Sequence, residues 1–159
     1  MAYPNDGDPI RLRALDALIA NLRAITTANG YHHDVRAVHL LQGEQVVTGS
    51  VMPVVIVAPE TETEDLRLTC DQVQMELTLG IYCALRVVPG AQKLSLNELE
   101  WLISDVKRAI DQDYQLGGLV TVIEPTNVEV FDIADEAIAG ARVSARMLYR
   151  HRVGDPATI

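Results

Sequence analysis

Three histidines lie close together in the sequence and carry side chains that could bind a metal ion. His32 and His33 are adjacent, and His39 follows in the same stretch. A structural or catalytic zinc site needs further ligands at supporting positions. Asp34 shares the segment, but no repeating ligand spacing is present. We therefore interpret this stretch as a loop followed by one histidine in a strand, and we expect no metal site.

Sequence motifs for nucleophilic catalysis and for phosphate binding are absent. The chain contains no GxSxG, no GxGxxG and no GxxxxGK[ST], the patterns that place a nucleophile or cradle a phosphate. Asp111 and Asp113 could pair as acid and base, but their place in a predicted surface turn favours a solvated pair. The sequence therefore offers no catalytic and no cofactor-binding candidate.

The two cysteines are predicted to be free, unreactive thiols. A single extended strand running from Cys70 through Cys83 would separate them by about 40 Å at ~3.3 Å per residue. That distance is far beyond the reach of a disulfide, and the two side chains would point to opposite faces. This cysteine usage favours a protein that folds in a cytoplasm.

The C-terminal stretch "ARVSARMLYRHRVGDP" alternates between basic and apolar residues. The arginines occupy even positions and the apolar side chains odd ones, which predicts a strand with one basic and one apolar face. This arginine ladder is unexpected in a chain of net charge -9. Its members are Arg142, Arg146, Arg150 and Arg152.

Two interpretations of the arginine ladder are open. In the first, the arginines face Gln72, Gln74 and Glu76 of a neighbouring strand, where opposite charges stabilise by about 0.2–1 kcal/mol per pair. In the second, they meet the acidic run "ETETED" of an identical copy, and such contacts close into a ring when the rotation allows. The acidic run itself is interpreted as a solvated loop, with a surface that must not bind DNA or contact to a basic partner as the alternatives. The hypothesised interface residues are Arg142, Arg146, Arg150, Glu60, Glu62, Glu64 and Asp65.

Two amphipathic helices are predicted. The first spans about residues 9–28, with Asp8 as N-cap, Pro9 at the first helical position and Asn29-Gly30 as the stop signal. The second begins at a capping box formed by Ser95 and Glu98 and ends at "QLGG". Each has an apolar stripe at helical spacing.

The remaining chain is predicted to be mostly extended. Strands are expected at 34–42, 52–59, 72–85 and 119–133 and in the arginine ladder, with turns at 43–50 and 134–140 and an acidic exposed loop at 60–67. Pro125 would break its strand or keep it at a sheet edge. Neighbouring strands without intervening helices indicate an α+β fold, a mixed or mostly antiparallel sheet with two main helices packed against it. We expect one domain over 1–159, with 1–7 and 154–159 as loose tails.

Composition restricts the class of partner. Thirteen basic residues against twenty-two acidic ones argue against a nucleic-acid clamp, which concentrates Lys and Arg. No apolar run reaches the roughly 20 residues of a membrane span, and the N-terminal stretch lacks the order of a signal peptide. We therefore expect no membrane association.

From about Asp8 to Pro156, the layout resembles the tail terminator (tail completion) proteins of long-tailed bacteriophages. The segments that carry the resemblance are "ANGYHHDVRAV", "MPVVIVAPETE", "QVQMELTLGIYCAL" and "LSLNELEWLISDVKRAIDQDYQLGG". The stretch from Asp105 to Gly118 and the spacing from Tyr149 to Pro156 contribute most to it.

The resemblance implies an α+β structural protein of the virion that is not an enzyme and needs no cofactor. Such proteins form a ring, typically a hexamer, on the head-proximal end of the tail tube. The ring stops tube growth and offers a docking surface to the head. The implied partners are further copies of the chain, the tail tube protein and a head-completion or connector protein, while genomic DNA passes through the lumen. Assembly would take place in the host cytoplasm.

Two alternatives remain for the function. The first is a head-closure or adaptor connector protein of the same phage neck. The second is an α+β ligand-binding domain of no phage origin, which would require a pocket with convergent polar groups.

Overall fold

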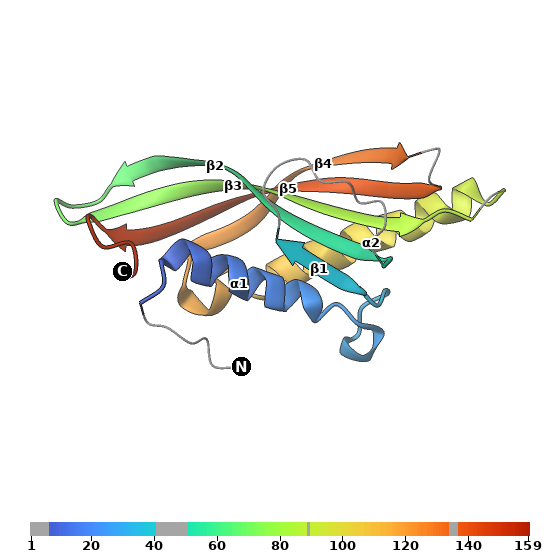
Figure 1. Ribbon diagram of the computed structural model, residues 1–159, viewed down its shortest axis with the longest axis horizontal. Helices are drawn as coiled ribbons and strands as arrows, with labels where there is room; N and C mark the ends of the chain where they lie inside the picture. Colours follow the sequence, from blue (N-terminus) through green and yellow to red (C-terminus); the bar gives the residue numbers. More distant parts are fainter. Residues whose placement is uncertain (1–6, 41–50, 89, 134–136) are drawn as a thin grey trace.

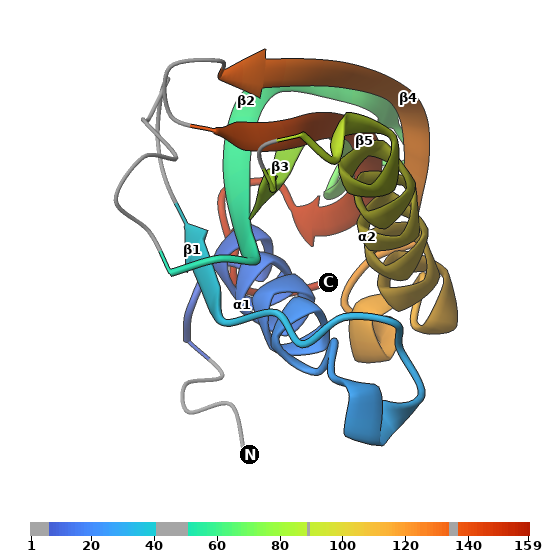
Figure 2. The ribbon, with the colours of Figure 1, turned by 90° about the vertical axis from the view of Figure 1, so that its right-hand side faces the viewer.

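A computed structural model describes residues 7–40, 51–88, 90–133 and 137–159. Five strands form one sheet in the order β1-β2-β3-β5-β4, and both helices lie against the same face of it (Figures 1 and 2). The pair β1 and β2 is parallel, and the other neighbouring pairs are antiparallel. The predicted α+β class is confirmed. The turn predicted at 43–50 lies outside the described residues, as does part of the turn at 134–140.

The first helix is shorter than predicted. Helix α1 (Ile10–Arg23) has Pro9 rather than Asp8 at the N-cap position. A separate 3-10 turn, η1 (Thr27–Asn29), follows because the residue before it is extended and interrupts the helical hydrogen bonds. Gly30 after η1 has a φ of 81°, a left-handed conformation that glycine adopts without steric cost. The predicted stop signal therefore ends η1 and not α1.

The second helix begins before the predicted capping box. Helix α2 (Gln92–Gln112) has Ala91 at its N-cap position. Ser95 is buried inside the helix, where its hydroxyl donates to the Ala91 carbonyl oxygen at 3.0 Å. A serine within a helix often makes this bond to the residue four positions back. The capping-box prediction is wrong, which leaves Glu98 free for a different role. A 3-10 turn, η2 (Leu116–Gly118), follows α2.

The acidic stretch at 60–67 is strand and not loop. Strand β2 (Val54–Arg67) pairs along its length with β3 (Gln72–Arg86), with irregularities between Pro59 and Thr61 and between Glu64 and Leu66. The loop was predicted from the high density of charged residues in this stretch. Pairing with the long alternating strand β3, together with the strand preference of threonine, decides the conformation.

The arginine ladder lies on an interior strand of the sheet. Strand β5 (Ile138–Arg152) lies between β3 and β4 (Val122–Ile133). Pro125 lies on β4, at one edge of the sheet, next to an irregularity in the pairing with β5. This placement confirms the expectation for Pro125, because an edge strand needs no N–H on its outer side.

The opposite edge begins with the short strand β1 (Ala37–Leu40), which starts three residues later than the strand predicted at 34–42, while residues 41 and 42 lie outside the described part of the chain. It pairs only with the first four residues of β2. Beyond them, β2 has no neighbour on its outer side among the described residues. The β2–β3 hairpin extends past the N-terminal end of α1 (Figure 1). The first five residues of β2 are buried, and most of the others are exposed.

The main core lies between the helices and the sheet face that they cover. Strands contribute the side chains of alternate positions, and each helix contributes its apolar stripe. A second, smaller apolar cluster lies on the opposite sheet face, formed by Val54, Ile56, Ala84 and Ile138. Among the described residues no helix combines the length and apolarity that a membrane span requires.

The C-terminal residues 154–159 are not a loose tail. The N–H of Arg152 donates to the Thr158 carbonyl oxygen at 2.8 Å, and the N–H of Ile10 donates to that of Pro156 at 2.9 Å. The second bond gives a partner to an amide in the first turn of α1, where no helical acceptor exists. The prediction was wrong because the second bond joins residues from opposite ends of the chain, which no local pattern reveals.

Candidate functional site

The arginine ladder lies on the sheet face opposite the helices. Along β5 the odd residues point into the core, and Val143 and Ala145 are fully buried there. Arg142 and Arg146 point the other way, opposite Tyr82 and Thr78 of β3. The predicted division of this strand into a basic and an apolar face is confirmed.

Arg142 forms an ion pair within its own chain. Its Nη2 donates to Glu60 Oε1 at 2.5 Å, and its Nη1 lies 3.7 Å from Glu129. A Cβ atom on Gly80 would lie 2.6 Å from that same Glu60 oxygen. Glu60 therefore reaches Arg142 because position 80 has no side chain. The hydrogen bond to Glu60 raises the pKa of the Arg142 guanidinium.

The next two arginines also have partners within the sheet. Arg146 donates to Glu124 of β4 through Nε, at 3.1 Å, and through Nη2. Its Nη1 lies 3.8 Å from Glu76. Arg150 Nε donates to Gln74 Oε1 at 3.1 Å. Glu76 and Gln74 were partners expected from the sequence, whereas Glu124 was not.

The four acids of "ETETED" do not form one acidic surface. Glu62 and Glu64 lie opposite Leu77 and Met75 of β3, on the face that the helices cover. Glu60 reaches the opposite face, and Asp65 accepts a hydrogen bond there from Gln74 at 2.7 Å. Glu64 pairs with Arg67 at 3.3 Å. The side-chain alternation of a strand separates charges that a loop would have kept together.

Glu62 connects the projecting hairpin to α1 and β5. The Tyr149 hydroxyl donates to its carboxylate, and Arg11 Nη1 lies 3.4 Å from it. Burial raises the pKa of Tyr149, and the adjacent Glu62 adds to the effect because a phenolate would face a carboxylate. In this contact, as in the ion pair of Arg142, the carboxylate comes from the same chain.

The acidic run lies on the outer edge of β2, where its charges can prevent association with other chains. An unpaired strand edge is a template for association with other chains, and charges, bulges and proline prevent that association. From Pro59 to Arg67 this edge carries all three. The run therefore has a sufficient explanation in the folded subunit.

A second group of polar contacts holds the loop after η1 against α2. Arg108 Nη1 donates to the Gly30 carbonyl oxygen at 2.6 Å, and its guanidinium carbon lies 4.8 Å from the centre of the Tyr31 ring. The Tyr31 hydroxyl donates to Gln112 Oε1 at 2.7 Å. These contacts fix the loop before it reaches the two histidines.

Asp105 binds the loop through its carboxylate. The residue is only 5% exposed. It accepts hydrogen bonds from the backbone N–H groups of His32, at 3.1 Å, and His33, at 2.9 Å. Its Oδ2 also lies 3.3 Å from His33 Nδ1. One buried carboxylate thus sets both the backbone path and the imidazole orientation at His33.

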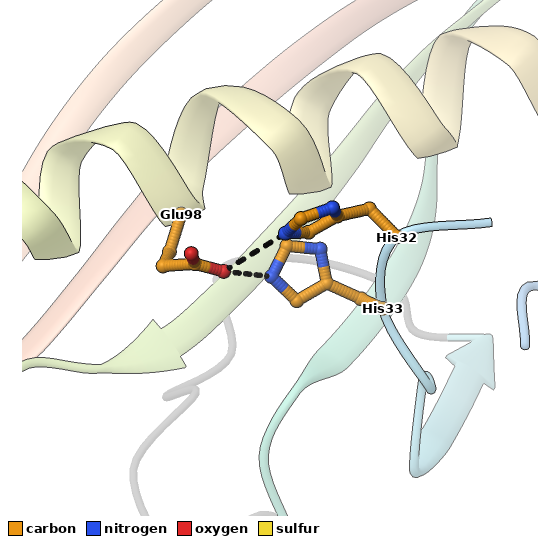
Figure 3. Close-up of side chains that lie close together, drawn as sticks. All are labelled: His32, His33 and Glu98. Carbon is orange, nitrogen blue, oxygen red and sulfur yellow. Dashed lines mark hydrogen bonds and ion pairs between the residues drawn. The ribbon is translucent and has the colours of Figure 1, made fainter. Parts of the chain in front are cut away.

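The two histidines converge on Glu98 of α2 (Figure 3). His33 Nε2 lies 2.9 Å and His32 Nε2 lies 3.4 Å from the same oxygen, Glu98 Oε2. The His32 ring stacks on Trp101, with centroids 4.8 Å apart and planes 14° from parallel. His39, the third histidine of the sequence cluster, lies on β1 and is not part of this group.

The histidine group borders an open hollow of about 660 Å³. The hollow brings together residues from the loop, α2, β3 and the segment that enters β2. It is lined by His33, Glu98, Val51, Met52, Pro53, Leu85 and Arg86.

The local sequence pattern did not predict this group, because Glu98 is separated from His33 by 65 positions. A signal was nevertheless present. Glu98, Trp101 and Asp105 recur at helical spacing, so they lie on one face of α2. The spacing of Ser95 and Glu98 instead predicts a helix cap, and the sequence pattern does not pair this face with the histidines.

The cysteines are free, as predicted, but Cys70 lies in the turn between β2 and β3 and not on the predicted strand. Cys70 is exposed and Cys83 is fully buried in the main core. Burial raises the pKa of the Cys83 thiol to about 12. This thiol is therefore unsuited to nucleophilic chemistry, which requires the thiolate.

No protein-family model matches the sequence of this chain, and no curated protein matches it. The resemblance to tail terminators stays a prediction that rests on the sequence segments given above.

Proposed function

We propose that the chain is a tail terminator, a structural protein that caps the head-proximal end of a phage tail tube as a ring, with six subunits expected. The observation that carries the proposal is the long projecting end of the sheet, where the β2–β3 hairpin and the C-terminal half of β5 run side by side beyond the half of the subunit that the helices cover (Figure 1). This shape suits a subunit that packs through one half and reaches a neighbour or the tube with the other. A closed ring requires such a pair of different contact surfaces on each subunit.

The end of the hairpin is the surface that we assign to the tube or to the next subunit. Leu66 near its end is 53% exposed, and Val153, which bonds to the backbone of Asp71 in the turn, is 46% exposed. Apolar side chains on an otherwise charged edge are suited to burial in an assembly. The ion pairs of Arg142 and Arg146 then stabilise the subunit itself, and the arginine ladder need not form the joint.

The charge distribution suits a conduit for DNA. Arg142 and Arg146 are paired with carboxylates, so their face offers phosphates little unpaired positive charge. The net charge of -9 opposes tight binding, since affinity for phosphates comes from concentrated cations. Genomic DNA would pass through such a ring without being held. The head-completion or connector protein would bind the other side of the ring.

Electron microscopy with tail tubes that lack their terminator tests the proposal. The purified chain is mixed with these tubes and with DNA-filled heads, and further tube protein is then added. Rings at one tube end, with no subsequent growth, are the expected result. Binding to heads and not to tubes would instead identify a head-closure or adaptor connector, and binding to neither would overturn both assignments.

A pair of leucine variants tests the assigned contact. Leu66→Ser at the hairpin end should reduce capping while the circular dichroism spectrum stays unchanged. Leu96→Ser is the matched control, because this leucine is similarly exposed, at 50%, but lies on α2. Full capping by Leu66→Ser would exclude the hairpin end as the contact.

A further inference from the structure

We propose that His32, His33 and Glu98 form a binding site for a divalent transition metal ion of the Zn²⁺ type. Two imidazole nitrogens and one carboxylate oxygen are a donor set that such ions prefer, whereas Mg²⁺ and Ca²⁺ favour oxygen alone. The site is independent of the role in the phage tail, because it depends only on contacts within one subunit.

The donor atoms are already close to a suitable spacing. In a tetrahedral site with bonds of ~2.0–2.1 Å, neighbouring ligand atoms lie about 3.4 Å apart. His32 Nε2 and His33 Nε2 lie 3.4 Å and 2.9 Å from Glu98 Oε2, and the ligand atoms of the three residues lie within 4.8 Å of one another. Small side-chain rotations would bring all three onto one ion.

Asp105 prepares His33 for this role. A histidine that binds a metal through one ring nitrogen usually donates the other N–H to a carboxylate or carbonyl, which fixes the tautomer. The Oδ2 of Asp105 lies 3.3 Å from His33 Nδ1, so the proton on Nδ1 leaves Nε2 as the free donor atom. The carboxylate is also held by the backbone N–H groups of both histidines, which limits its movement.

Neighbouring side chains restrict His32, the second histidine ligand, and leave the site open to solvent. The ring of His32 is stacked on Trp101, which restricts its rotation while 42% of the side chain stays exposed. His33 is 12% and Glu98 is 41% exposed at the side chain, and both line the hollow. An ion can therefore enter from solvent, and water can take the remaining position. Three protein ligands with one open position are typical of zinc sites that exchange a ligand.

Bound metal would connect the loop to α2. The histidines belong to the segment after η1, and Glu98 belongs to the helix, so one ion crosslinks two elements. Because such an ion binds the folded chain preferentially, it raises the melting temperature by mass action. A Zn²⁺ concentration ~100 times Kd would raise Tm by about 5–10 °C for a chain of this size.

Zinc titration of the untagged full chain, freed of metal with EDTA, tests the proposal. Calorimetry should give one Zn²⁺ per chain, and Co²⁺ should give the visible absorption of a nitrogen- and oxygen-bound ion. Glu98→Gln and His33→Ala should each weaken Zn²⁺ binding at least tenfold. Asp105→Asn should weaken it by about 10–100-fold, the range known for residues that orient a ligand. His39→Ala is the matched control and should bind as the wild type does.

The outcomes distinguish metal binding from a simple ion pair of protonated histidines with Glu98. Each variant is melted with Zn²⁺ and with EDTA, and the difference in Tm is the readout, so a change in basal stability does not obscure it. The proposal is supported if the wild type and His39→Ala show the Zn²⁺-dependent rise and Glu98→Gln shows at most about half of it. Absence of equimolar binding to the wild type, or an equal rise in Glu98→Gln, would overturn it.

Discussion

The pairing of Arg142 with Glu60 can be measured by a double-mutant cycle in the isolated chain. The single changes are Arg142→Met, which keeps much of the apolar stem, and Glu60→Gln, which keeps the shape. The side chains are 24% and 30% exposed and meet at 2.5 Å, so they are less screened than most surface pairs. Exposed pairs couple by 0.2–1 kcal/mol, and the charge-assisted contact over Gly80 places this pair at the upper end. We expect a coupling free energy of about 1 kcal/mol.

The assay is urea unfolding followed by circular dichroism, with each variant measured at two protein concentrations. A cycle on Glu64 and Arg67 is the control, because that pair is more exposed, at 47% and 56%, and lies three residues apart on one strand. Its coupling should be clearly smaller. Neither coupling should depend on protein concentration, since both pairs form within one chain.

Two results would refute the reasoning. A coupling for Arg142 and Glu60 no larger than that of the control would mean that Gly80 and the strand irregularity do not create a protected pair. A coupling that appears only at high protein concentration would show that the partner carboxylate comes from another copy. The second result would restore the interpretation of the arginine ladder as a subunit joint.

Two further predictions concern groups with shifted pKa values. A thiol reagent at pH 8 should modify Cys70 and spare Cys83 in the folded chain, because Cys83 is fully buried with a pKa of about 12; modification of both at the same rate would contradict this burial. The pKa of Tyr149 is raised by burial and by Glu62. The stabilisation that the protonated Tyr149 gives the folded state is therefore complete below the unfolded-state pKa of about 10, and it is lost as the pH rises above that value. The fall in Tm above pH ~10 should accordingly be smaller in Tyr149→Phe than in the wild type, and equal falls would assign the alkaline loss to other groups.

Strand β3 and the two faces of β5 could be predicted from the sequence because strict alternation has a single structural solution. Residues buried on one face must recur at every second position, and both strands meet that condition. Strand β2 could not be predicted in full. Its acidic half carries no apolar alternation, and its conformation comes from hydrogen bonds to β3 and not from burial of its own side chains.

The ends of the helices illustrate a second limit. Ser95 and Glu98 have the spacing of a capping box, yet α2 begins earlier and both residues make other contacts. Local patterns state which bonds a residue is able to make, but competing partners elsewhere in the chain decide which bonds form. Residues 154–159 contact the rest of the chain for the same reason, since the Pro156 carbonyl oxygen accepts a hydrogen bond from the distant N–H of Ile10.

The sequence by itself determined the α+β class, the basic and apolar faces of the last strand and the free state of the cysteines, because periodicity and spacing are local properties. Only the tertiary structure decided which carboxylates the arginines meet, since Glu60 and Glu124 arrive from two different strands. It also decided that His32 and His33 converge on Glu98, because the contact requires the loop after α1 to pack against α2. The sequence determines which side chains are present, but the packing of distant elements determines which of them meet.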